Sequence, residues 1–172
     1  DLVVLGRRPG SSAEPARLGS TSDVVIRRRH GPSLFVPLSI SRIHRVVIAL
    51  DGTLRGLGVL ESAASLVTMT GAEPNSVTVI PDGGPTDAAA TNPRAIRVRQ
   101  ALERFPGLGE ASRLRILRGE PVGEILGFLA EIKADLLVLG VRGGGPTGEM
   151  GSGHVGRDLL QAANVAILSI PI

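Results

Sequence analysis

Apolar and polar residues alternate with two different periods from His44 to the end of the chain. Short runs rich in β-branched and aliphatic residues predict strands at 45–50, 76–80, 114–117, 136–139 and 165–170. The longer segments between these runs place their apolar residues at helical spacing. Strands that alternate with helices are typical of a parallel sheet covered by helices. The pattern over residues 44–172 therefore predicts an α/β fold with an open, doubly wound, five-stranded parallel sheet.

Local stop and start signals place the predicted helices between these strands. A helix after the first strand is expected to end at Gly71, because glycine tolerates the left-handed conformation of a helix C-terminus. Asn92 and Pro93 offer an N-cap and a first-turn proline for a helix through residue 105. Glu120 and Pro121 open the next helix, and the last helix is expected at about 153–163.

The first residues of the chain repeat a later segment. The sequence DLVVLG at 1–6 recurs as DLLVLG at 135–140, and Gly19 recurs as Gly153, each 134 residues further on. In the same register Leu34 matches Leu168. Residues 1–40 therefore resemble a partial second copy that holds only strand four, the last helix and strand five of the domain at 44–172.

A fragment of this size cannot bury its own apolar faces. We therefore expect residues 34–38 to lie against residues 165–170, in a pseudo-symmetric contact at a sheet edge that would otherwise be open. A homodimer through the same strand is the intermolecular version of this contact.

Composition narrows the classes of function. The chain holds no cysteine, tyrosine or tryptophan, which excludes disulfides, thiolate chemistry and cysteine-based zinc sites. The densest basic run, at 27–30, is interpreted as a solvated helix end, since single-stranded nucleic acid sites usually add stacking aromatic residues. Neither a membrane span nor a signal peptide is visible, and a cytoplasmic location is expected.

Two loops are expected to meet at the carboxyl edge of the sheet, where ligands bind in doubly wound folds. One is the turn Asp51, Gly52 and Thr53 after the first strand, and the other runs from Gly140 to Gly153 after the fourth. The glycine-rich loop and the helix N-terminus that follows it suit a phosphate group. Glycine runs also form plain flexible turns.

The carboxylate of Asp51 has several interpretations. It could accept hydrogen bonds from ribose hydroxyls or adenine, hold a metal ion on a phosphate, or cap the first helix. No cluster of aspartate, glutamate and histidine at ligand spacing predicts a metal site made by protein groups alone.

Taken together, the two loops resemble those of the universal stress protein family (UspA-like). That family carries an Asp-Gly-Ser/Thr turn after strand one and a Gly-x2-Gly-x9-Gly-Ser/Thr loop after strand four. Here Asp51-Gly52-Thr53 matches the turn, and Gly140, Gly143 and Gly153 match the glycines of the loop. The resemblance covers residues 44–172, and it implies a Rossmann-like sheet with strand order 3-2-1-4-5. Residues 1–38 resemble the tail of a truncated first copy in a tandem protein.

The resemblance further implies an ATP site, with Mg²⁺ as a companion of the phosphates. Carried over by position, the contacts would come from Asp51, Gly52, Thr53, Ile80, Pro81, Gly140, Arg142, Gly143, Gly153, His154 and Val155. In this scheme Asp51 contacts ribose or adenine, the backbone at residues 80–81 walls the adenine, and the last glycine with its neighbours holds the terminal phosphates. No catalytic residue is implied.

Two departures from the family pattern affect this expectation. His154 stands where the family has a serine or threonine, so either its ring donates a hydrogen bond, or Gly151 and Ser152 replace the hydroxyl, or phosphate binding is lost. In the first copy, Pro9 takes the place of the second glycine and lacks an N–H group for a phosphate. No complete site is expected there.

The leading hypothesis is a nucleotide-responsive stress or regulatory protein that changes its partner contacts on binding ATP. A weak ATPase is one alternative, although no positioned general base is evident. A docking domain of a larger protein, such as a transporter, that does not bind nucleotide is the other.

Overall fold

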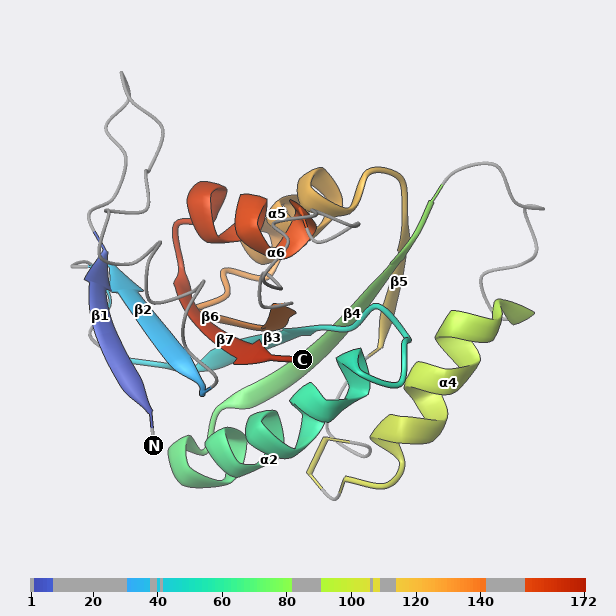
Figure 1. The fold of residues 1–172 in the computed structure, drawn as a ribbon, viewed down its shortest axis with the longest axis horizontal. Helices are drawn as coiled ribbons and strands as arrows, with labels where there is room; N and C mark the ends of the chain where they lie inside the picture. Colours follow the sequence, from blue (N-terminus) through green and yellow to red (C-terminus); the bar gives the residue numbers. More distant parts are fainter. Residues whose placement is uncertain are drawn as a thin grey trace, which may run out of the picture.

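The computed structural model of the chain describes residues 2–7, 31–37, 40, 42–81, 91–105, 107–108, 114–141 and 154–172. Within these ranges, seven strands form one sheet in the order β1-β2-β7-β6-β3-β4-β5 (Figure 1). The strands are β1 (Val3–Arg7), β2 (Ser33–Pro37), β3 (Arg45–Ala49), β4 (Glu73–Ile80), β5 (Arg115–Arg118), β6 (Leu136–Val141) and β7 (Ala166–Pro171). The helices are the 3₁₀ turn η1 (Gly56–Gly58), α2 (Val59–Thr70), α4 (Pro93–Leu102), α5 (Pro121–Glu131) and α6 (His154–Ala162).

The five strands β3 to β7 confirm the predicted sheet. β3 lies in the middle and pairs in parallel with β4 on one side and β6 on the other. β5 extends the sheet beyond β4, and β7 extends it beyond β6, both again in parallel. Counted along residues 44–172, the order is 3-2-1-4-5. The direction of winding therefore changes between β3 and β6, where doubly wound folds open a crevice.

Helices cover both faces of this sheet and create two apolar layers. Alternate residues of β6 point to opposite faces, as in any strand. Leu136 and Val138 join the cluster beneath α2 and α4, whereas Leu137 and Leu139 join the cluster beneath α5 and α6. The four side chains are between 0% and 3% exposed, so β6 is buried on both sides. None of the described helices has the length and apolar character that crossing a bilayer requires.

The capping signals were interpreted correctly at three helix ends. Gly71 ends α2 in a left-handed conformation with φ of 64°, and its N–H donates to the carbonyl of Val67 at 2.9 Å. Asn92 Oδ1 accepts from the N–H of Arg94 at 2.9 Å at the start of α4. The Glu120 carboxylate caps α5 in the same manner. The sequence therefore fixes these ends through local chemistry.

Three boundaries differ from the prediction. β4 begins at Glu73, before the expected residue 76, and includes Pro74. The missing N–H of Pro74 is tolerated because, among the described residues, β5 pairs with β4 only from Val77 onward. β6 continues through Gly140 to Val141, and α4 ends at Leu102, before the predicted residue 105.

The contact predicted between the two copies is present. β2 pairs antiparallel with β7, and its register places Leu34 directly opposite Leu168, with Phe35 opposite Ile167 (Figure 1). Leu34 and Leu168 are also the repeat equivalents separated by 134 residues, so a pseudo-twofold axis passes between them. β1 pairs in parallel with β2, as β6 does with β7. The helix expected between β1 and β2 lies outside the described residues.

Candidate functional site

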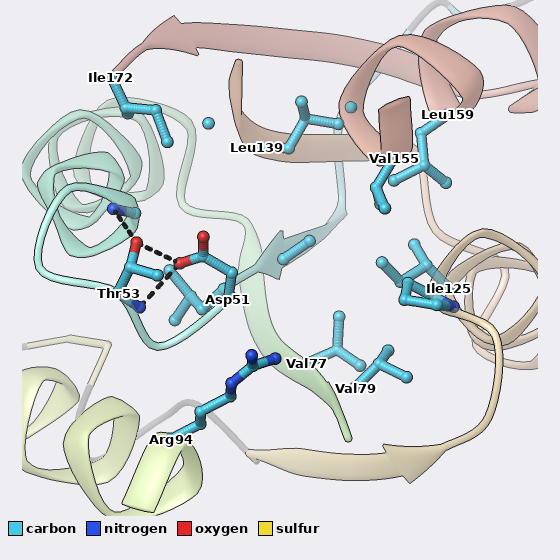
Figure 2. A pocket seen from close by; sticks show the side chains of 16 residues that line it. Asp51, Thr53, Val77, Val79, Arg94, Ile125, Leu139, Val155, Leu159 and Ile172 are labelled. Carbon is cyan, nitrogen blue, oxygen red and sulfur yellow. Dashed lines mark hydrogen bonds between the residues drawn. The ribbon is translucent and has the colours of Figure 1, made fainter. Parts of the chain in front are cut away.

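The turn after β3 is built around the side chain of Asp51. Its Oδ1 accepts hydrogen bonds from the backbone N–H and the hydroxyl of Thr53, both at 2.8 Å. The Thr53 hydroxyl in turn accepts from the N–H of Gly56 at 3.0 Å. One carboxylate oxygen is thereby used to shape the turn, and Oδ2 makes no hydrogen bond within the described part of the chain (Figure 2). Oδ2 is the oxygen that remains for a ligand.

The helix-capping interpretation of Asp51 is wrong in its simple form. The residues at the N-cap positions of η1 and α2 are Arg55 and Gly58, and neither caps its helix through a side chain. The carboxylate therefore acts one step earlier, since it orders Thr53 and the start of η1 rather than a helix N-terminus.

Two glycines allow the turn to adopt this shape. Gly52 has φ of 68°, and a β-carbon there would lie 2.9 Å from both Cβ and the carbonyl oxygen of Arg94. A β-carbon at Gly56 would collide with the Asp51 carboxylate. Sequence reasoning identified Gly52 but missed Gly56, because the contact between residues 51 and 56 exists only once the turn has formed.

Helix α4 packs on the outside of this turn. Arg97 Nε donates a hydrogen bond of 2.8 Å to the carbonyl oxygen of Gly52, across 45 residues of sequence. The backbone of Arg94 lies against Gly52 on the same side. The position of Asp51 is therefore fixed from outside its own segment, by a helix that no sequence signal connected with the site.

A cavity of about 300 Å³ opens above the carboxyl ends of β3, β4 and β6 (Figure 2). One side is polar and carries Asp51, Thr53 and Arg94. The rest of the lining is apolar backbone and side chain: Ala49, Leu50, Gly56, Val77, Val79, Pro121, Ile125, Leu139, Gly140, Val155, Gly156, Leu159 and Ile172. The volume lies at the lower end of the range for small-molecule sites, and an apolar wall with a few convergent polar groups is typical of them.

The opposite edge of the cavity is formed by β6 and α6. Gly140 lies at the end of β6, and a β-carbon there would approach Ile172 Cδ1 to 2.8 Å and Val59 Cγ2 to 3.2 Å. Val155 and Gly156 bring the first turn of α6 to the cavity, and a β-carbon at Gly156 would contact the Gly140 carbonyl oxygen at 3.4 Å. The N-terminal end of a nine-residue helix therefore lies beside the cavity, where its partial positive charge favours an anion.

The structure brings together part of the predicted set. Asp51, Thr53, Gly140 and Val155 line the cavity, and Gly52 supports the turn from behind. Arg142, Gly143 and Gly153 lie outside the described residues, as do Gly151, Ser152 and the side chain of His154. The expectations for them are therefore not tested.

Residues 80 and 81 were expected to wall the adenine, and neither is among the residues that line the cavity. On β4 the lining side chains are Val77 and Val79, which point to the face beneath α5 and α6. Ile80 falls on the other parity of the strand, and its carbonyl oxygen already accepts from the N–H of Gly119 at 3.1 Å.

Helix α5 contributes Pro121 and Ile125 to the cavity, and its start is held by Glu120. The Glu120 carboxylate accepts from the N–H of Gly123 at 2.7 Å and of Val122 at 2.9 Å. These two hydrogen bonds hold the pKa of Glu120 below its ordinary value, since they favour the charged form. Among the described residues no group of three aspartate, glutamate, histidine or cysteine side chains could hold a metal ion.

Comparison with known proteins identifies the family. The model of the universal stress protein family matches residues 42–171, about three quarters of the chain. The chain belongs to the universal stress protein family. No curated protein sequence matches it significantly.

Solved universal stress proteins share the fold described above. One from Archaeoglobus fulgidus is 27% identical, with a TM-score of 0.62 over 74% of this chain and 98% of its own length. Another from the same organism, solved with dAMP, is 24% identical, with a TM-score of 0.58 over 76% of this chain and 99% of its own. A longer one from Archaeoglobus fulgidus DSM 4304 is 24% identical, with a TM-score of 0.77 over 99% of this chain, which spans only 62% of its length.

Proposed function

We propose that this universal stress protein binds ATP in the cavity between Asp51 and the N-terminus of α6. The observation that carries the proposal is the free Oδ2 of Asp51, which lies over an otherwise apolar cavity of about 300 Å³ (Figure 2). The distribution of polarity suits a nucleotide. A carboxylate accepts hydrogen bonds from ribose hydroxyls or a base amino group, and an apolar wall packs on the faces of a base.

The phosphates would lie toward α6. Helix N-termini favour anions through their free N–H groups and their dipole, and Gly140 lets the backbone of β6 come close to the ligand. Residues 142, 143, 153 and 154 are proposed to complete the phosphate site, and Mg²⁺ would arrive with the phosphates. The solved relative from Archaeoglobus fulgidus that carries dAMP supports an adenine nucleotide as the ligand class.

We propose regulation rather than catalysis as the consequence of binding. A ligand changes partner contacts only when the partner binds the occupied and empty forms with different affinity. The described residues that line the cavity include one carboxylate, and half of its hydrogen-bonding capacity is used to hold Thr53. This arrangement suits the recognition of a nucleotide better than the activation of a water molecule, for which a free general base is needed.

The chain is further proposed to consist of a partial repeat at 1–40 and a complete domain at 44–172. The antiparallel pairing of β2 with β7 supports this division, because it places repeat-equivalent leucines opposite each other. Since β2 occupies the edge of β7, the pseudo-dimer within one chain replaces a homodimer through that edge. A location in the cytoplasm is part of the same proposal.

Isothermal titration of ATP into the wild-type chain and an Asp51→Asn variant tests the proposed function. Asparagine keeps an oxygen for Thr53 but replaces the other carboxylate oxygen with a donor. Losing a charged hydrogen bond costs about 1.5–3 kcal/mol, so the Kd is expected to rise about 10- to 100-fold. Asp158→Asn is the matched control, because Asp158 is an exposed carboxylate on α6 that does not line the cavity. Wild-type protein that shows no ATP binding at millimolar concentrations would refute the proposal.

A further inference from the structure

Arg94 is the one charged side chain besides Asp51 among the described residues that line the cavity. It lies in the first turn of α4, a helix outside both loops that the family pattern identifies. Figure 2 shows its guanidinium group directed from α4 into the space between Asp51 and Val77. No carboxylate among the described residues forms an ion pair with Arg94. Its donors therefore remain available to a ligand.

The strand order fixes which end of the cavity Arg94 serves. β3, with Asp51 at its end, is flanked by β6 on one side and β4 on the other. Gly140 and the N-terminus of α6 lie on the β6 side, whereas Val77, Val79 and Arg94 lie on the β4 side. A nucleotide with its phosphates toward α6 therefore places its base beside β4 and Arg94.

The position of Arg94 is tied to that of Asp51. The β-carbon and backbone of Arg94 pack on Gly52, and Arg97 of the same helix donates to the Gly52 carbonyl at 2.8 Å. The N-terminus of α4 is itself fixed by the Asn92 cap. A fixed acceptor at Asp51 and a set of planar donors at Arg94 thus approach the same end of the cavity from two sides.

We propose that Arg94 is a specificity-determining residue that contacts the base of the nucleotide, together with Asp51. The proposal rests on the function proposed above. An adenine edge presents an amino donor beside a ring-nitrogen acceptor, which complements a carboxylate beside a guanidinium group. The planar guanidinium group also stacks on aromatic rings, which an ammonium group does less well. The family pattern places base contacts at residues 80 and 81, so this role is additional to it.

The test uses two probes that share a base, ATP and adenosine, with the full chain. The variant is Arg94→Met, because methionine keeps an unbranched stem that packs on Gly52 and removes the donors. Arg94→Lys keeps the charge without the planar fork. Arg104→Met is the matched control, since Arg104 is exposed just beyond the end of α4 and does not line the cavity. Isothermal titration gives the Kd for ATP, and ligand-observed NMR gives the Kd for adenosine.

Arg94→Met is expected to weaken ATP and adenosine by the same factor, about tenfold, while Arg104→Met leaves both unchanged. Arg94→Lys is expected to stay within about threefold of the methionine variant for both probes. A loss for ATP without a loss for adenosine would overturn the proposal, because the residue would then act on phosphate. Wild-type affinity in Arg94→Met, or its recovery in Arg94→Lys, would overturn it as well.

The two proposals fail in different ways. If wild-type protein binds neither probe, the nucleotide site itself is absent and both proposals are refuted. If wild-type protein binds ATP and Asp51→Asn weakens it, the site stands, and the Arg94 variants alone decide the role of Arg94. Thermal unfolding of each variant confirms that the fold is retained.

Discussion

The strands β1 and β6 carry nearly the same sequence but have different surroundings. Leu2 and Val4 match Leu136 and Val138 at a separation of 134 residues. Leu2 is 52% exposed and Val4 is 60% exposed, whereas both equivalents in β6 are fully buried. β6 has a strand on each side, and β1 pairs only with β2 within the described residues. A repeated sequence therefore acquires its burial, and its part in a cavity, from the elements that surround it.

The same comparison holds at the carboxyl ends of the two strands. Gly140 lines the cavity, and its position is enclosed by Ile172 and Val59. Its equivalent, Gly6, has no atom within 4 Å of the place where a β-carbon would stand. What β1 lacks among the described residues is a neighbour like β3, which brings the Asp51 turn to the end of β6. The glycine motif alone does not make a site.

The largest expected difference concerns the apolar residues of the two strands. Leu136→Ala should lower the free energy of unfolding by about 3 kcal/mol, because it leaves a cavity between β6 and the layer of α2. Leu2→Ala, at the equivalent position, should change it by less than about 0.5 kcal/mol. Urea denaturation monitored by circular dichroism measures both. Equal effects would show that β1 is as buried as β6, contrary to the exposure described above.

A smaller difference is expected at the two glycines. Gly140→Ala forces Ile172 and Val59 to move, which should cost about 1 kcal/mol and narrow the cavity. The cost is moderate because the nearest atom, Ile172 Cδ1, is the end of a flexible side chain. Gly6→Ala meets open space and should stay within about 0.5 kcal/mol of wild type. Paired unfolding curves test this, and a destabilised Gly6→Ala would indicate an enclosed position at β1.

Local patterns in the sequence were sufficient to predict the sheet and half of the site. The apolar runs at β3, β6 and β7 and the caps at Gly71 and Asn92 depend on neighbouring residues, so the sequence alone identifies them. The repeat also predicted the pairing of β2 with β7. These features follow from strand and helix periodicity and from the chemistry of turns.

The missing half of the site consists of residues brought in by packing. Arg94 and Ile125 belong to helices whose sequence shows only an amphipathic pattern, and their place at the cavity depends on how α4 and α5 pack on the sheet. The exchange of Ile80 for Val77 and Val79 depends on strand parity relative to the helices. Gly56 is specified by a contact with a side chain five residues earlier. No local motif carries such information.

The smallest expected effect concerns Glu120, which has no counterpart in the partial copy. Its pKa is lowered in the folded chain, so its carboxylate stabilises the fold above the ordinary pKa of 4.5, and this contribution is lost as the pH falls through the lower, folded value. Glu120→Gln removes the charge at the start of α5 at every pH. The variant should therefore be less stable than wild type at pH 7, and the two should converge at about pH 3. Urea midpoints measured across this range test the expectation, with the exposed Glu103→Gln as control. A difference between wild type and Glu120→Gln that persists undiminished at low pH would show that the cap acts through its shape and not through its charge, and α5 would then hold Pro121 and Ile125 at the cavity independently of pH.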